Sequence, residues 1–120
     1  MPKVPNMNTY ERAIQIYQVL IAAAHNRQLL TYEIVGGHIG VPKQGLAGHL
    51  EHILRHCERR GLPALTSICV SKLTGLPSHG FTDRVPTTPE ALQREREAVY
   101  AHNWYGERPV TVADLQSNPK

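Results

Sequence analysis

Residues 30–53, LTYEIVGGHIGVPKQGLAGHLEHI, decide the fold expected for this chain. Thr31 can cap a short helix over YEIVGGHIG. The Gly-Val-Pro turn at residues 40–42 must end that helix, because proline disfavours the helical conformation in the residue before it. A long helix follows over residues 43–60, with its apolar side chains gathered on one side. A short helix, a tight turn and a long helix together predict a helix-turn-helix.

The segments on either side extend this unit. Upstream, Asn8 and Glu11 form a capping box, and apolar residues at steps of three and four predict a helix over residues 9–25. Downstream of Gly61, the weakly alternating LPALTSICVSK and the turn-forming LTGLPSHG predict a strand, a turn and a short return, which together make a β-hairpin. A proline directly after Thr88 marks the start of a further helix.

These elements predict a mainly α-helical fold with a small β-hairpin, arranged as a winged helix-turn-helix followed by a C-terminal helix. A chain of 120 residues has room for one modest core. We expect residues 1–86 to form the winged-helix domain. Residues 87–120 are expected to form a C-terminal helix and tail that pack on this domain or extend from it.

Composition places the chain among globular cytoplasmic proteins. Hydrophobic residues make up 41% of the chain and charged residues 19%, which argues against disorder. The longest apolar run, residues 19–24, is far too short to cross a bilayer, and the N-terminus lacks the apolar centre of a signal peptide. We therefore expect a cytoplasmic protein without a membrane partner. Cys57 and Cys69 are too few for a disulfide scaffold and lack the paired spacing of a zinc site.

The basic charge is concentrated in the middle of the chain. The net charge is +3, and residues 43–86 hold six basic and three acidic residues together with four of the seven histidines. A polyanion such as DNA would therefore meet the protein in this segment. Mild basicity agrees with a nucleic-acid partner but does not require one.

Several short motifs follow one another along the chain: Thr31-Tyr32, Gly40-Val41-Pro42, Gly45-Leu46-Ala47-Gly48, Leu62-Pro63, Gly75 and Gly80-Phe81. In this order, across residues 10–81, they resemble the DNA-binding domain of the alkylguanine-DNA alkyltransferases and of their catalytically inactive alkyltransferase-like relatives. The resemblance implies a winged helix that binds DNA.

The chain departs from that family at the residues that carry alkyl transfer. The family's Pro-Cys-His-Arg string is absent, and its nucleophile position falls on Ser67 or Ile68, depending on the motif from which it is counted. Cys69 has no adjacent histidine to take its proton. The family's DNA-inserting arginine, expected near Gly45, is also missing, so base flipping by the long helix loses its wedge. We therefore predict a non-enzymatic protein without a catalytic residue.

Three histidines share one face of the long helix. His49, His52 and His56 lie within about 60° of one another. They could ligate a metal, contact nucleic acid or a protein, or lie in solvent, but no fourth ligand accompanies them. We predict no metal and no cofactor. If these imidazoles face an anionic partner, binding should strengthen as the pH falls from about 7.5 to 6.

The candidate DNA contacts combine the turn, the start of the long helix and the hairpin. They are Tyr32, Lys43, Gln44, Gly48, His49, His52, Lys72 and His79. Glycine at the start of the helix lets the backbone approach a groove wall or a phosphate, although it also allows tight packing against the helix over residues 9–25. A lysine on a hairpin such as Lys72 is more often merely solvated, and Tyr32 could equally form the edge of the core.

The sequence favours a non-enzymatic winged-helix DNA-binding protein on an alkyltransferase-like scaffold. The alternative is a protein-interaction module, such as an adaptor or inhibitor in nucleic-acid metabolism or in a defence system, which uses the same helix and the C-terminal segment. Clustering of Lys43, Lys72, Arg59 and the histidines on one surface would favour DNA. An exposed apolar patch with Trp104 and Tyr105 would favour a protein partner.

Overall fold

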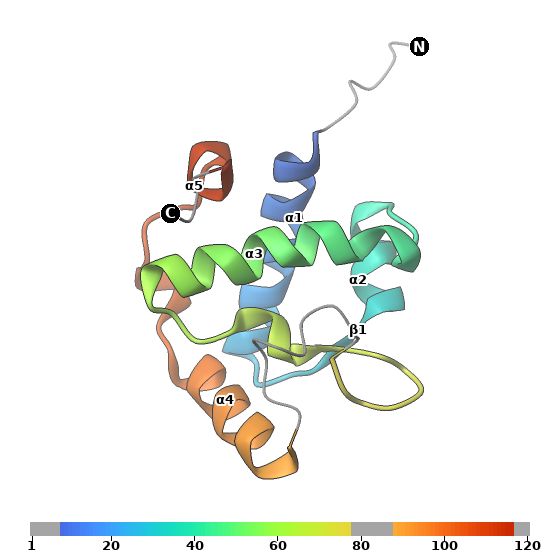
Figure 1. Cartoon of the computed structure of the whole chain (residues 1–120), viewed down its shortest axis with the longest axis vertical. Helices are drawn as coiled ribbons and strands as arrows, with labels where there is room; N and C mark the ends of the chain where they lie inside the picture. The colour runs from blue at the N-terminus through green and yellow to red at the C-terminus, as the bar shows by residue number, and fades with distance from the viewer. Residues whose placement is uncertain (1–7, 78–87, 117–120) are drawn as a thin grey trace.

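The structure, a computed structural model of the whole chain, describes residues 8–77 and 88–116. It shows a mainly helical protein with a small two-stranded sheet (Figure 1). The elements are, in chain order, α1 (Thr9–His25), β1 (Leu30–Thr31), α2 (Tyr32–Ile39), the 3-10 turn η1 (Lys43–Gly45), α3 (Leu46–Arg60), the 3-10 turn η2 (Leu65–Ile68), β2 (Cys69–Val70), α4 (Pro89–Ala101), the 3-10 turn η3 (Trp104–Gly106) and α5 (Val112–Gln116).

Local capping sets where the helices begin. The side chain of Asn8 accepts a hydrogen bond from the backbone N–H of Glu11, whose carboxylate accepts from the N–H of Asn8, so the predicted capping box of α1 is confirmed. Thr31 accepts from the N–H of Ile34 at the start of α2, and Thr88 caps α4 in the same way. Each cap satisfies an amide that the first helical turn leaves unpaired.

Two glycines end the helices of the helix-turn-helix segment. Gly40 after α2 and Gly61 after α3 have φ values of 75° and 66°, in the left-handed region that glycine adopts without a steric cost. The predicted long helix over residues 43–60 begins three residues late, because Lys43–Gly45 forms a 3-10 turn. Residues 9–25 and the start at Pro89 agree with the sequence-based prediction.

The segment predicted as the first strand of a hairpin differs from expectation. Leu65–Ile68 forms a 3-10 turn, and only Cys69–Val70 is extended. This strand pairs in parallel with β1, Leu30 opposite Cys69 and Thr31 opposite Val70, so the pairing in the described part of the chain is not that of a hairpin. Residues 64–70 are all buried, which removes the alternation by which a half-buried strand is recognised.

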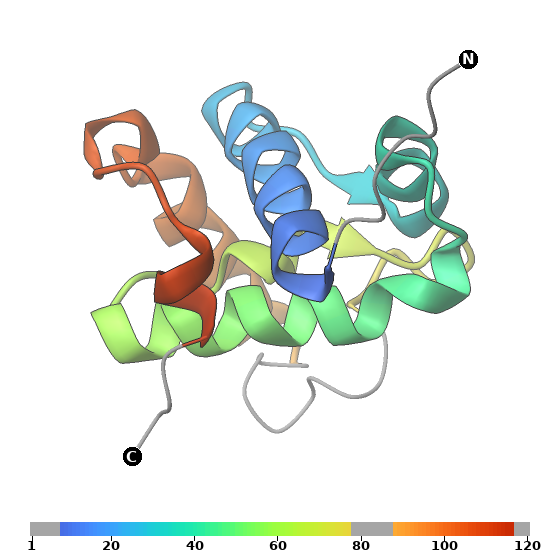
Figure 2. The same cartoon turned by 90° about the horizontal axis from the view of Figure 1, so that it is seen from above.

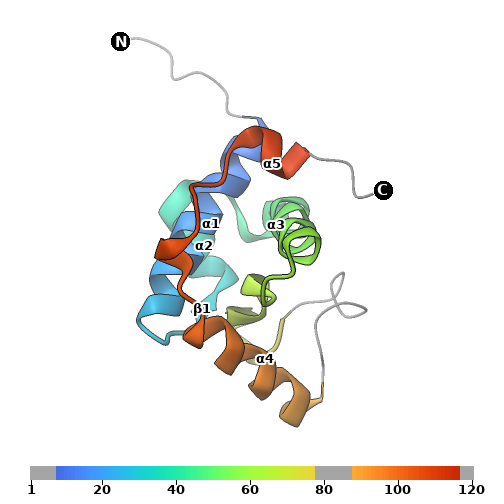
Figure 3. The same ribbon diagram turned by 90° about the vertical axis from the view of Figure 1, so that its left-hand side faces the viewer.

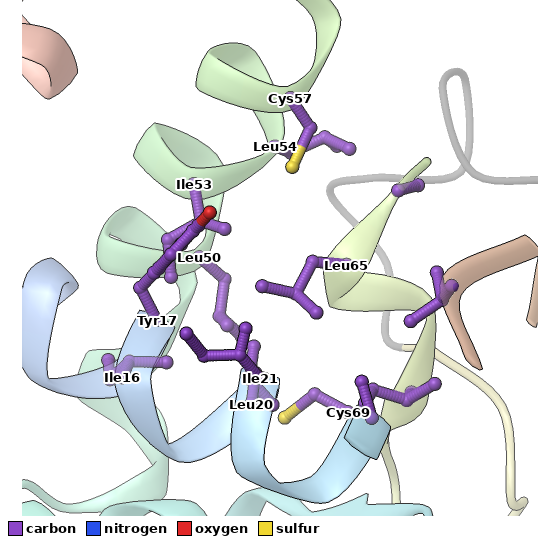
Figure 4. Close-up of a cluster of buried hydrophobic side chains, with 14 of the residues drawn as sticks. Ile16, Tyr17, Leu20, Ile21, Leu50, Ile53, Leu54, Cys57, Leu65 and Cys69 are labelled. Atoms are coloured by element: carbon purple, nitrogen blue, oxygen red, sulfur yellow. The ribbon is translucent and has the colours of Figure 1, made fainter. Parts of the chain in front are cut away.

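The core forms where α1 crosses α3, with η2 closing one side. Figure 4 shows this cluster, in which Tyr17 and Leu20 of α1 lie near Leu50 and Ile53 of α3, with Leu65 of η2 beside them. Burial of such side chains contributes roughly 1.5–3 kcal/mol each.

The C-terminal elements pack on this core. α4 contacts η2 and α1, whereas α5 contacts α3 and α1 (Figures 2 and 3). Leu92 and Val99 of α4 and Leu115 of α5 are buried, which anchors both helices. Among the helices that the structure describes, none has the length and apolar content to cross a membrane.

Candidate functional site

Three segments that carry predicted DNA contacts lie at the same end of the molecule. Figures 1 and 2 show α2, the first turn of α3 and the loop of residues 71–77 together at the right-hand end, away from α5. We call this region the helix-turn-helix end. It brings together segments that are up to 45 residues apart in the sequence, from residue 32 to residue 77.

Three predicted contact residues are exposed at this end. Gln44 of η1, Gly48 of α3 and Lys72 of the loop all present their surface to solvent. A Cβ atom placed on Gly48 would meet no atom within 4 Å. The backbone of Lys43 lies in η1, but its side chain falls outside the described part of the structure, as does the whole of His79.

Three other predicted contacts are turned toward neighbouring elements. Tyr32 is half-buried and packs against the core. His49 is half-buried, with its Nδ1 2.9 Å from the hydroxyl of Thr9 at the start of α1. The ring of His52 lies 4.6 Å from the ring of Tyr10, also on α1. The two histidines thus connect α3 to α1, and all three side chains are only partly available to a partner.

The histidine face is therefore a half-buried to buried packing surface, which corrects the expectation of a free polar stripe. The third member, His56, is only 5% exposed, and its ring stands edge-on to Tyr17 at 6.0 Å. Burial lowers the pKa of His49, His52 and His56, because the charged imidazolium loses hydration. Among the described residues, no group of three or more histidine, cysteine, aspartate or glutamate side chains could hold a metal ion.

A small cavity lies between His56 and the C-terminal segment. Tyr17, His56, Glu107 and Asp114 line it, together with Arg60 and Arg108. Its volume is about 10 Å³, close to the minimum that one water molecule occupies. The cavity can hold a single bridging water and is too small for a substrate.

Several of the arginines hold the fold together. Arg59 donates to the backbone oxygen of Asp114 at 2.7 Å, and Arg12 donates to that of Ile39, also at 2.7 Å. Arg55 pairs with Glu51 within α3 at 2.9 Å. Arg59 is thus engaged with the C-terminal segment, close to His52 and His56, and its guanidinium is not free to form a basic surface with Lys72.

Trp104 and Tyr105, which together would have favoured a protein partner, do not form an exposed apolar patch on the described surface. Trp104 is only 4% exposed, and its indole Nε1 donates to the backbone oxygen of Val99 at 2.8 Å. Tyr105 is 60% exposed and makes an edge contact with His25, their ring centroids 5.3 Å apart. Trp104 therefore cannot join Tyr105 in an exposed apolar patch.

Both cysteines are unsuited to nucleophilic chemistry. Cys69 and Cys57 are buried, and burial raises the pKa of each thiol to about 12. Ser67, one of the two residues at which the resemblance would place the nucleophile, is also buried, and its hydroxyl has no hydrogen-bond partner among the described residues. A thiol with a raised pKa and no solvent access is neither ionised nor reachable at neutral pH.

We expect Cys69 to react slowly with thiol reagents in the native protein. Labelling should require unfolding, because the side chain is fully buried and protonated. Cys69→Ser should lower the free energy of unfolding by about 1–3 kcal/mol, because it buries a hydroxyl in an apolar site. The measurements are a timed labelling course followed by mass spectrometry and a urea titration. Rapid labelling of Cys69 at neutral pH without unfolding would contradict the burial argument.

Two exposed residues at this end were not predicted. Ala47 precedes Gly48 on the solvent side of α3, and Leu73 is 93% exposed on the loop. Ala47 lies four and eight residues before the charged residues Glu51 and Arg55, so helical spacing from these could have identified it as solvent-facing. Nothing in the sequence could have identified Leu73, because periodicity does not determine exposure in a loop.

Comparison with known proteins adds no relative: no family model, no curated protein and no solved structure matches this chain.

Proposed function

We propose that this chain is a non-enzymatic winged-helix DNA-binding protein built on an alkyltransferase-like scaffold. In this proposal, the exposed start of α3 lies against duplex DNA and the loop of residues 71–77 serves as the wing. The observation that carries the proposal is Gly48, a glycine inside a helix that the fold does not require.

Gly48 lies in the third position of α3, exposed, with open space where a side chain would be. Glycine inside a helix costs roughly 1 kcal/mol relative to alanine. Gly45, by comparison, has an internal reason, because a Cβ there would lie 3.2 Å from a methyl group of Val41. A partner that approaches the backbone of α3 closely supplies the missing reason for Gly48, and a DNA groove wall or phosphate does this.

The charge and capping of this end also support an anionic partner. The N-cap residue of α3, Gly45, makes no side-chain capping bond, and the first turn contains no acidic residue. Amide groups at a helix N-terminus favour phosphate. Glu33 in the first turn of α2 is an exposed carboxylate at this end, but residues 34–50 and 59–82 contain no Asp or Glu that would repel DNA.

The buried thiols support the non-enzymatic part of the proposal. Alkyl transfer to this chain would need a thiolate that alkylguanine can reach, and neither Cys57 nor Cys69 offers one. The burial and the unpaired hydroxyl of Ser67 likewise leave it without a base to activate it.

The alternative, a protein-interaction module, is favoured by a different observation. Large apolar side chains remain exposed at Leu29, Ile34, Leu73, Leu76 and Tyr105. A protein partner would need several of them to form one continuous patch, because stable interfaces bury about 800 Å² on each side. Loss of binding to a protein partner, with no effect on DNA, after substitution of these side chains would support this alternative.

Gly48→Ala tests the DNA proposal by separating stability from binding. We expect the free energy of unfolding to rise by about 0.5–1 kcal/mol, since alanine favours the helix and its Cβ meets nothing. Affinity for duplex DNA should fall severalfold, because the added methyl group keeps a phosphate or groove wall away from the backbone. Fluorescence anisotropy at two salt concentrations and a urea titration measure the two effects.

Gln44→Ala and Gln18→Ala form a matched pair for the same titration. Both glutamines are exposed, but Gln18 lies on α1 and not at the helix-turn-helix end. Only Gln44→Ala should weaken duplex binding. If the wild type binds no DNA at low salt, or if Gly48→Ala is stabilised with unchanged affinity, the DNA proposal is wrong.

A further inference from the structure

The loop of residues 71–77 is built by its own hydrogen bonds. The N–H of Ser71 donates to the oxygen of Leu76 at 2.8 Å, and the N–H of Gly75 donates to the oxygen of Ser71 at 2.8 Å. The hydroxyls of Ser71 and Thr74 accept from the N–H groups of Leu73 and Leu76 at 3.2 and 3.1 Å. Gly75 has a φ of 70°, which permits the tight reversal. The loop therefore has a defined conformation.

A side chain from α4 fixes this loop to the body of the protein. Arg96 donates through Nε to the backbone oxygen of Ser67 at 3.0 Å and through Nη2 to that of Gly75 at 3.1 Å. One guanidinium thus joins the segment before the loop to the turn within it. Because its planar fork makes both bonds, the orientation of the loop relative to α4 is set.

This hydrogen-bonded loop exposes a leucine almost entirely to water. Leu73 is 93% exposed, the highest exposure among the large hydrophobic residues that the structure describes, and Lys72 beside it is also exposed. A single exposed leucine needs no explanation on an ordinary surface. Here, however, it stands on a hydrogen-bonded loop next to a lysine, at the end of the molecule where α3 begins.

We propose that Leu73 is an apolar wedge that inserts between adjacent base pairs of duplex DNA from the minor groove, while Lys72 contacts a neighbouring phosphate. This inference rests on the proposed DNA-binding function and names the group that deforms the duplex. Proteins that bend DNA in this way use leucine and similar apolar side chains to separate a base step. Such a side chain needs a rigid loop beneath it, because it must hold its position while the two bases separate.

A duplex fits these observations better than a protein partner does. A single leucine can act by inserting into a base step, whereas an apolar protein interface needs a continuous patch. Leu76, the other exposed leucine of this loop, is only 43% exposed, against 93% for Leu73. The residues beside Leu73 are Lys72 and Thr74, which suit a phosphate backbone better than an apolar interface. The loop and its approaches, residues 59–82, contain no carboxylate.

The test uses a duplex that carries 2-aminopurine, whose fluorescence rises when it loses stacking, and a duplex labelled at both ends to report bending. Wild-type protein should raise the 2-aminopurine signal and shorten the end-to-end distance. Leu73→Ala should lose both signals and bind about tenfold more weakly, since the free energy of burying a leucine is worth at least that factor. Leu73→Phe should keep both signals.

Two controls separate the wedge from general surface effects. Lys72→Ala should reduce the salt dependence of binding by about one phosphate contact and retain the 2-aminopurine signal. Tyr105→Ala, which removes an exposed apolar side chain on η3 at the other end of the molecule, should change neither signal. Circular dichroism of each variant confirms that the helices are intact.

The outcomes are distinct. If the wild type binds duplex DNA and Gly48→Ala weakens it, but Leu73→Ala keeps full affinity and both signals, the wedge is wrong and the DNA proposal stands. If Leu73→Ala has no effect on DNA but lowers self-association in sedimentation, Leu73 contacts a second copy, and the wedge is again wrong. If the wild type binds no duplex, both proposals are wrong.

Discussion

Replacing Trp104 with alanine is expected to destabilise the protein by about 3–5 kcal/mol, the usual cost of removing a large buried aromatic side chain. The indole is 4% exposed, stands edge-on to Tyr17 at 6.2 Å and to His102 at 4.5 Å, and hydrogen-bonds the end of α4. It therefore joins η3 and α4 to the centre of α1. Because domains of this kind have a total stability of about 5–15 kcal/mol, the variant should be close to unfolding.

A urea titration followed by far-UV circular dichroism measures this effect, since Trp104 is the only tryptophan and fluorescence would lose its probe. Tyr105→Ala is the matched control, because it removes the adjacent aromatic ring, which is 60% exposed. Tyr105→Ala should lower the free energy of unfolding by less than about 1 kcal/mol. Equal stability of the two variants would show that the C-terminal segment does not pack on α1 as the structure has it.

The helical framework could be predicted from the sequence because its signals are local. The capping box at Asn8, the cap at Thr31 and the left-handed glycine at residue 40 each act within one turn of the chain. Such contacts do not depend on the rest of the fold, so the residue types reveal them directly. A signal of the same kind lies at α5. The N–H of Thr111 donates to the carboxylate of Asp114 at 2.8 Å, and the N–H of Asp114 donates to the hydroxyl of Thr111 at 3.3 Å.

The segment after α3 could not be predicted in the same way. Its pairing with β1 joins residues 39 positions apart, Leu30 with Cys69, and no local pattern encodes that distance. The turn predicted at Gly75 is confirmed, whereas the neighbouring strand pairs with β1 and does not fold back on itself. Complete burial of η2 and β2 hid the alternation that would have shown which side faces the core.

The candidate site was predictable only where exposure follows from helix geometry. Position on the helix shows that His49, His52 and His56 share a face, but it does not show which element covers that face. Thr9 and Tyr10 of α1 cover the first two, and Tyr17 lies against the third. Residues far away in the sequence thus decided whether the histidines were a site or a packing surface.

Acid is expected to destabilise the folded protein between pH 7.5 and pH 5, because three partly or fully buried imidazoles must become charged. Charged neighbours act on each of them. For His49, Arg12 of α1 also lowers the pKa, whereas the hydrogen bond between His49 and Thr9 raises the pKa. For His52, the arginines of α3 at 55 and 59 lower the pKa and the carboxylate at 51 raises it. Burial is the largest cause in each case.

His56 faces the most charged groups, and they oppose one another. Asp114 of α5 raises its pKa, whereas Arg59, Arg60 and Arg108 lower it, and burial again has the largest effect. The result is a pKa below the ordinary value. Asp114 stays ionised throughout this range, because its bonds to Arg108 and Thr111 hold its own pKa well below the usual value of 3.8.

The direction follows from proton binding. In the unfolded chain these imidazoles take up protons near pH 6.5, whereas in the folded protein they do so only at lower pH. The unfolded state therefore binds more protons between these values. Stability is fully present above about pH 6.5 and is lost as the pH falls through that value. The stability that the Arg108–Asp114 pair contributes is lost in a separate pH range, below the usual carboxyl pKa.

The measurement is the Tm of the wild type and of His49→Gln/His52→Gln/His56→Gln at pH 7.5, 6 and 5. The wild type should lose several degrees over this range, and the triple variant, although less stable at pH 7.5, should lose much less. His38→Gln, an exposed histidine on α2, is the control and should follow the wild type. An equal fall in Tm in the triple variant would mean that groups other than these three histidines cause the loss of stability in acid.

This result would also show whether pH acts on the stability of the fold or on the affinity for DNA. A free histidine face predicts that DNA affinity rises between pH 7.5 and 6, because protons are taken up when the anion binds. Histidines packed against α1 predict instead that the fold weakens over the same range. We therefore expect the affinity of the folded protein for DNA to change little between these pH values. A steep rise in affinity that the triple variant lacks would return His49 and His52 to the interface.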